Sequence, residues 1–146
     1  MRVLVVLAVL SVAACGGGNS PTGPGSSIPT VTGNYSGTTT ITFPELQATV
    51  SCPTTTVVTQ SGSTVSIAPL VLGGDCDGIS VPLGQVRIDT TGALDGGSAS
   101  GTYNEPSCGV YSYTASGGFF GRELRISMTA TSSTCLNFNF STVLTR

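Results

Sequence analysis

The chain has 146 residues, of which 8% are charged, and its formal net charge at pH 7 is −2. Such a composition provides no basic surface for nucleic acid. The sequence contains neither histidine nor lysine, which excludes Ser–His and Cys–His pairs, Schiff bases and Ser–Lys dyads. Its seven acids lie mostly in turn-like contexts and form no recognisable acid–base pair. We therefore expect a protein that is not an enzyme and that uses no cofactor.

The first residues have the pattern of an export signal. Arg2 precedes the apolar run 3–10, which is too short for a transmembrane helix. The run leads into Val12-Ala13-Ala14-Cys15, which resembles the lipobox of bacterial lipoproteins. This resemblance implies that residues 1–14 are a lipoprotein signal peptide and that Cys15 becomes the acylated first residue, carrying palmitate or a similar chain. The alternative is an ordinary secretory signal followed by an unpaired cysteine.

The residues after Cys15 indicate where the anchored protein is retained. In lipoproteins of double-membrane bacteria an aspartate after the cysteine favours the inner membrane. This chain has Gly16 there, so the resemblance implies the cell envelope and favours the outer membrane. Residues 15–30 are rich in Gly, Ser and Pro, and we expect them to form a flexible tether.

Residues 31–146 have the length of one domain and a pattern typical of β-strands. Short runs of Thr, Val, Ile, Tyr and Phe alternate with Gly, Pro, Asn and Asp, and no window shows helical periodicity. A hairpin turn is expected at Ser61-Gly62. The sequence predicts about eight strands, at 33–43, 54–60, 63–72, 85–90, 98–104, 110–116, 122–131 and 136–146.

The alternation within these strands indicates how they pack. Leu124, Ile126 and Met128 share one face of the strand 122–131, opposite charged and polar residues. A sheet with one apolar face and one wet face is typical of antiparallel pairing. Consecutive strands with a single apolar face favour closure into an all-β, antiparallel up-and-down barrel. The alternative is a β-sandwich.

Four cysteines remain besides Cys15, and an even number in an exported chain suggests two disulfides. They are Cys52, Cys76, Cys108 and Cys135. Their spacing contains no CxxC pair, so we expect no zinc site. Asp75-Cys76-Asp77-Gly78 looks like the start of a calcium loop, but no further acids follow, so we expect no metal there.

Spacing alone leaves three disulfide pairings open. If the strands alternate in direction, the four cysteines gather at one rim of the barrel. Along the chain, Cys52 and Cys76 bracket the hairpin 54–72, and Cys108 and Cys135 bracket the hairpin 110–131. On this argument we favour the pairs Cys52–Cys76 and Cys108–Cys135.

The first predicted strand begins with Gly33-Asn34-Tyr35. This resembles the G-x-W motif of the calycins, the eight-stranded barrels that include lipocalins and avidins, with tyrosine in place of tryptophan. The resemblance implies a barrel able to hold a small apolar ligand. It also implies that a late arginine, Arg122 or Arg146, packs on the Tyr35 ring.

Four aromatic residues are candidates for ligand or lip contacts: Tyr35, Tyr103, Phe119 and Phe120. The last two lie between glycines in Gly117–Gly121, where they form either a hydrophobic lip or, as we favour, a plug in the barrel.

We expect a lipid-anchored, non-catalytic envelope domain that acts as a binding or structural module for another envelope component. The alternative is a carrier of a small apolar ligand, and an inhibitor of an extracellular hydrolase is a third hypothesis. The barrel interior distinguishes the binding module from the carrier, because a carrier needs a hollow interior. Inward Phe43, Met128, Phe138 and Phe140 would fill it, whereas inward Gly37, Ala99, Gly101 and Thr142 would leave it hollow.

Overall fold

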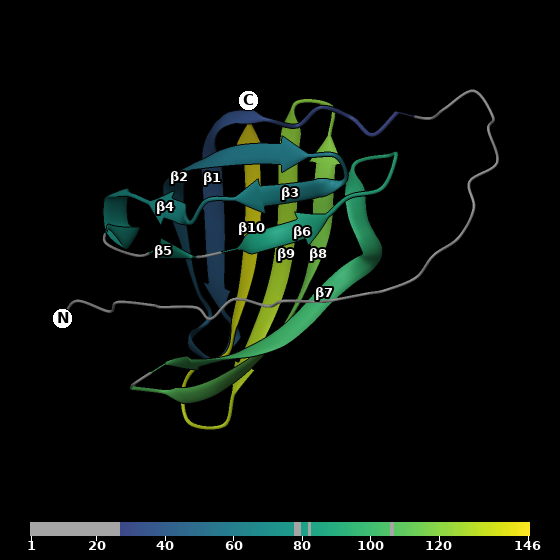
Figure 1. Ribbon diagram of the computed structural model, residues 1–146. Coiled ribbons are helices and arrows are strands. Elements are labelled where there is room, and N and C mark those ends of the chain that lie inside the picture. Colours follow the sequence, from purple (N-terminus) through teal and green to yellow (C-terminus); the bar gives the residue numbers. More distant parts are fainter. Residues whose placement is uncertain (1–26, 78–79, 82, 106) are drawn as a thin grey trace.

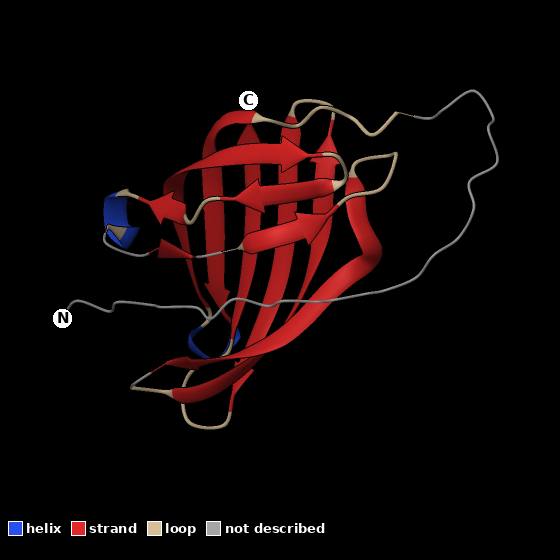
Figure 2. Ribbon diagram, in the orientation of Figure 1, coloured by secondary structure: helices blue, strands red, loops and turns tan. Residues whose placement is uncertain are grey.

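The computed structural model describes residues 27–77, 80–81, 83–105 and 107–146. This part of the chain forms one antiparallel sheet that curls into a barrel (Figure 1), with two short 3-10 turns between strands (Figure 2). Within it, no helix has the length and apolar character needed to cross a membrane. The strands are β1 (Gly33–Phe43), β2 (Ala48–Ser61), β3 (Thr64–Ile67), β4 (Leu70–Leu72), β5 (Ser80–Val81), β6 (Gly84–Arg87), β7 (Ala93–Glu105), β8 (Gly109–Phe120), β9 (Glu123–Ser132) and β10 (Phe138–Thr145), and the turns are η1 (Pro44–Leu46) and η2 (Gly74–Cys76).

The order of the strands is that of an up-and-down barrel. β7, β8, β9 and β10 pair in succession, β10 pairs with β1, β1 with β2, β2 with β3 and β3 with β6. A bridge between Ile88 and Leu94 then joins the end of β6 to β7. β4 and β5 form a branch beside β2. In Figure 1 the front strands β3 and β6 cross steeply over β10 and β9 behind them. The predicted all-β barrel is confirmed.

Several strand boundaries differ from the predicted ones, at prolines and glycines. β2 starts at Ala48 and runs through Pro53, so its first part is a strand where we expected a loop. The predicted strand 63–72 divides into β3 and β4, and the Ala68 N–H between them donates to the Val57 carbonyl at 2.9 Å. β8 continues through the expected loop as far as Phe120.

The glycines inside β8 have a packing role rather than a turn role. A Cβ on Gly117 would lie 2.1 Å from the Arg125 carbonyl oxygen on β9, and Gly117 has a φ of +146°. A glycine is needed here because the neighbouring backbone passes too close for any side chain. The turn between β8 and β9 is correspondingly only Gly121-Arg122.

Large side chains fill the interior of the barrel. Tyr35 and Phe119 are each 1% exposed, and their rings meet edge to face with centroids 5.9 Å apart. Phe140 is buried against the same core. Other residues pack there as buried or half-buried side chains, among them Phe43, Leu70, Leu72, Leu124, Met128, Phe138 and Leu144.

A short chain of buried threonines crosses this core. The Oγ1 atoms of Thr39 and Thr142 are 2.8 Å apart, and that of Thr54 lies 2.9 Å from Thr39 Oγ1 and 3.0 Å from the Cys52 carbonyl oxygen. Thr142, expected to leave space, therefore contributes to a hydrogen-bonded layer. In the described part of the chain no buried side-chain nitrogen or oxygen lacks a partner.

The structure contains the two favoured cysteine pairs. The Cα atoms are 5.9 Å apart in Cys52–Cys76 and 5.4 Å apart in Cys108–Cys135. The prediction that all four cysteines share one rim is wrong. Cys52 lies opposite Thr39 in the interior of β2 and belongs to the main core, because β2 begins earlier than predicted. Cys108 and Cys135 pack instead in a small cluster with Tyr111.

The end of the chain closes over the start of β1. Arg146 donates from Nη1 to the carbonyl oxygens of Thr30 at 3.1 Å and Thr32 at 2.8 Å. The Tyr35 hydroxyl donates to the Val31 carbonyl at 2.8 Å. Burial raises the pKa of this hydroxyl, and the positive charge of Arg146 offsets part of the increase. In the described residues the cation–π contact is that of Arg125 with Phe120, so the predicted arginine on the Tyr35 ring is not observed.

Asp89 organises the turn between β6 and β7. Its Oδ1 accepts hydrogen bonds from the Thr91 hydroxyl at 2.6 Å, the Thr91 N–H at 2.7 Å and the Ala93 N–H at 3.1 Å. These bonds hold the pKa of Asp89 below its usual value, and the bond from the Thr91 hydroxyl contributes most. Such a carboxylate stabilises the fold above its unfolded pKa of about 3.9, and the contribution is lost as pH falls through the lower folded pKa.

We therefore expect Asp89→Asn to lower the thermal unfolding midpoint at pH 7. The gap to the wild type should shrink as the pH falls below about 3.9, because protonated Asp89 then resembles asparagine. Calorimetry across this pH range measures both effects, with Asp77→Asn as the control in an exposed turn. A gap that is independent of pH would show that the Asp89 charge does not support the turn.

Candidate functional site

The outer face of the sheet carries two parallel rows of neutral polar side chains, which we call the hydroxyl face. Each row crosses β2, β1, β10, β9, β8 and β7 in that order, because the registers of the paired strands bring these residues side by side. The first row is Ser51, Thr40, Ser141, Ser127, Ser116 and Ser98. The second is Thr49, Thr42, Asn139, Thr129, Thr114 and Ser100.

The alternation of each strand places these residues outside. On β9, Ile126 and Met128 turn inward while Ser127 and Thr129 turn outward. Neighbouring side chains within a row are separated by the strand spacing of about 4.8 Å, and the two rows by about 6.8 Å, the length of two residues. The result is a regular, neutral array of hydroxyl groups with one amide.

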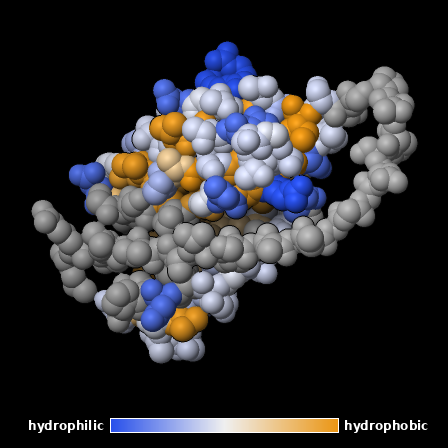
Figure 3. Space-filling model, viewed as in Figure 1, coloured by the Kyte–Doolittle hydropathy of each residue, from blue (hydrophilic) through white to orange (hydrophobic). Residues whose placement is uncertain are grey.

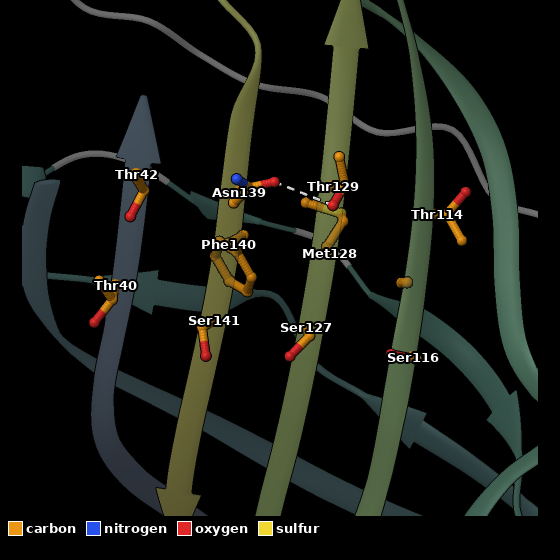
Figure 4. A pocket seen from close by; sticks show the side chains of 11 residues that line it. Thr40, Thr42, Thr114, Ser116, Ser127, Met128, Thr129, Asn139, Phe140 and Ser141 are labelled. Atoms are coloured by element: carbon orange, nitrogen blue, oxygen red, sulfur yellow. Dashed lines mark hydrogen bonds between the residues drawn. The ribbon is translucent and has the colours of Figure 1, made fainter. Parts of the chain in front are cut away.

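The middle of the hydroxyl face is hollowed. A shallow depression of about 350 Å³ is lined by residues of β1, β10, β9 and β8. Figure 4 shows the four strands side by side, with Thr40 and Thr42 on the first, Asn139 and Ser141 on the second, Ser127 and Thr129 on the third and Thr114 and Ser116 on the fourth.

Some groups of the hydroxyl face are bonded to each other and others are open to a ligand. Thr129 Oγ1 donates to Asn139 Oδ1 at 3.1 Å, shown as the dashed line in Figure 4. The described part of the chain provides no hydrogen-bond partner for the exposed hydroxyls of Thr114, Ser116 and Ser127. These hydroxyls can bind a ligand without breaking any internal bond.

Neither row contains a charged residue, but charges flank the face on both sides, with Glu45 bonded to Asn137 beyond the second row and an ion pair beyond the first. Further along β9, Arg125 forms an ion pair with Glu123, and its guanidinium carbon lies 5.8 Å from the centre of the Phe120 ring. The site therefore offers hydrogen-bond donors and acceptors but no charged group of its own for a charged ligand.

Glu45, like Asp89, supports the fold through hydrogen bonds. Glu45 Oε1 accepts a hydrogen bond from the Asn137 N–H at 3.2 Å, which ties η1 to the segment before β10. The pKa of Glu45 is lowered, first by a hydrogen bond from its own backbone N–H and then by the bonds from Asn137. Nowhere in residues 27–77, 80–81, 83–105 and 107–146 do three histidine, cysteine or acidic side chains come together as metal ligands.

The structure separates the sequence-predicted candidate residues. Cys15 lies outside the described residues, and Tyr103 is placed only by its backbone, opposite Tyr111. Tyr35 and Phe119 are core residues, so the GGFFG segment does not form a two-ring lip. Phe120, the next residue along the strand, points outward and is 48% exposed.

A second depression, of about 560 Å³, lies outside β2 and β4 and is more apolar than the first. Its lining includes Val57, Pro69 and Val71, and the two valines are exposed. On the side seen in Figure 3, hydrophobic groups are scattered between polar ones rather than joined in one patch.

Sequence reasoning missed the hydroxyl face as a site, although part of its signal was visible. The alternation at 122–131 already placed polar residues, Ser127 among them, on the wet side. The alignment of these residues across strands depends on the register, which no single strand encodes. No protein-family model, curated protein or solved structure matches this chain.

Proposed function

We propose that this chain is a non-catalytic, lipid-anchored domain of the bacterial cell envelope that binds its partner through the hydroxyl face. The observation that carries the proposal is the contrast between the two sides of the same strands. Inward side chains fill the barrel, while outward side chains present a hollowed array of open hydroxyls. Binding at the outer surface follows from this distribution.

The packed interior argues for a binding module over an apolar carrier. A carrier needs an empty space inside the barrel. Here Tyr35 and Phe119 are each 1% exposed and contact each other inside the barrel, and Phe140 is 3% exposed in the same core. A ligand in the interior would have to displace these side chains.

The anchor part of the proposal rests on the lipobox-like residues that end at Cys15. The structure corrects the end of the predicted tether, because Ile28 packs against the core and the carbonyls of Pro29 and Thr30 accept hydrogen bonds from Gln60 and Arg146. Residues 16–27 have the composition of a flexible coil, whose span is on the order of 20 Å. This tether would hold the barrel near the membrane and leave its faces free to turn toward a partner. With Gly16 after the cysteine, we propose the outer membrane as its location.

A fractionation experiment tests anchor and face together. In a host fed labelled palmitate, we expect the full chain to be labelled and membrane-bound, and Cys15→Ser to be unlabelled and released. In the Cys15→Ser background, the chain should still be retained by envelope fragments of the bacterium that encodes it. Adding Ser127→Arg should abolish this retention, because a bulky charge then occupies the depression.

The control for the second step is Thr59→Arg, an equally bulky change at an exposed position of β2 outside the hydroxyl face. An unlabelled wild-type chain would refute the lipid anchor. Equal retention of Ser127→Arg and Thr59→Arg would refute the hydroxyl face as the binding surface.

A further inference from the structure

Building on the proposed function, we infer that the ligand of the hydroxyl face is a neutral polysaccharide. The first argument is chemical. Each serine or threonine hydroxyl donates one hydrogen bond and accepts others, and neither row offers a charge. A complementary ligand must therefore present many neutral groups that also both donate and accept. Sugar hydroxyls have this property.

The charges near the face argue against ionic polymers. Arg125, the cation nearest to the rows on β9, is held by Glu123 and lies against Phe120. A nucleic acid or an acidic glycan would have to break this pair to gain one cation. Its remaining negative groups would lie over hydroxyls that provide no counter-charge.

The shape of the face favours a chain over a single small molecule. Six strands spaced about 4.8 Å apart make each row about 24 Å long. The depression occupies the middle of the rows, and Ser51 and Ser98 continue the first row beyond it on both sides. A long, open and shallow strip of this kind contacts successive units of a polymer.

An exposed aromatic residue lies to one side of the rows, four residues beyond Ser116 along β8, or about 14 Å. Phe120 is 48% exposed and lies on the same outward side of β8 as Thr114 and Ser116. Its ring offers an apolar surface on which the C–H face of a sugar unit that extends beyond the rows would pack.

The mode of binding follows from the exposure of the rows. Hydroxyls that are hydrated in the free protein contribute little individually when they exchange water for a sugar. Affinity then comes from repetition along the glycan, and several anchored copies on one membrane add avidity. We therefore expect the binding strength to rise with glycan length.

The experiment uses the full-length, lipidated chain, purified in a detergent without a sugar headgroup. It is applied to an array of neutral glucans, mannans, galactans and xylans of increasing length, with heparin and polygalacturonate as anionic probes. The wild type should bind at least one neutral series more strongly as its length increases, and neither anionic probe.

The test variant is Thr114→Val with Ser127→Ala, which removes two open hydroxyls and no internal hydrogen bond. We expect it to bind the selected glycan about tenfold more weakly. The matched control is Thr55→Val with Thr59→Val on the outer side of β2, which should bind as the wild type does. Circular dichroism and thermal unfolding of all variants establish that the fold is retained.

The outcomes distinguish failure of the polysaccharide inference from failure of the proposed binding surface. Binding to no neutral glycan, or preference for the anionic probes, overturns the polysaccharide inference. If the retention on envelope fragments is still lost in Ser127→Arg, the hydroxyl face remains a binding surface with a different partner. Glycan binding that is unchanged in the test variant also overturns the inference, because the sugar then binds elsewhere.

Discussion

Replacing Phe119 by alanine is expected to destabilise the domain by about 3–5 kcal/mol, the usual cost of removing a buried phenylalanine. The same change at Phe120, the next residue, should cost less than about 1 kcal/mol, as is usual for surface positions. Phe119 is 1% exposed and packs against Tyr35, whereas Phe120 is 48% exposed and contacts Arg125. Two adjacent, chemically identical side chains thus lie on opposite sides of β8.

Urea unfolding monitored by far-ultraviolet circular dichroism measures both variants. Each variant is the natural control of the other, because the residue type and the strand are shared. Similar small effects at the two positions would mean that the barrel end is open and that both rings form a lip. In that case a carrier function would again have to be considered.

Removing the Cys52–Cys76 disulfide by a double alanine substitution should also be strongly destabilising. The bond closes a separation of 24 residues, for which loop entropy alone predicts about 3–4 kcal/mol. Cys52 is fully buried and Cys76 is 4% exposed in the main core, so the missing sulfur atoms also leave unfilled space.

The matched variant removes Cys108–Cys135, which closes a similar separation of 27 residues. Both of these cysteines are only half-buried, so we expect a smaller loss than for the core pair. Chemical denaturation compares the two, and the denaturing mass before and after reduction counts the bonds. Equal losses would contradict the additional contribution of burial. An unchanged mass on reduction would contradict the disulfides themselves.

Local alternation was sufficient to predict much of the fold. β1 covers the predicted 33–43, and the inward residues Leu124 and Ile126 of β9 are buried as expected. The predicted hairpin between β2 and β3 is observed, with its turn at Gly62-Ser63, one residue later than expected. Such features follow from period two and turn chemistry within a few residues, so a single sequence contains them.

Other predictions failed where distant backbone segments decide the local structure. Pro53 and Gly117 looked like strand breakers, yet both lie inside strands. Gly117 is required because the Arg125 carbonyl on β9 passes beside it. The predicted strand 136–146 begins later than expected, because Leu136 precedes β10 and is 38% exposed.

The sequence by itself predicted the strand-rich barrel class and, in strands such as β9, which residues face water. It also favoured the two cysteine pairs that the structure contains, although the shared rim from which they were argued is wrong. Only the tertiary structure decided which residues of different strands meet in the core and on the outer surface. Thr39 and Thr142 are 103 residues apart and meet because β10 closes on β1. The same closure aligns Thr40 with Ser141 into the hydroxyl face. Strand pairing between distant segments depends on the packing of the whole sheet, and a shift by one residue would turn every side chain to the opposite face.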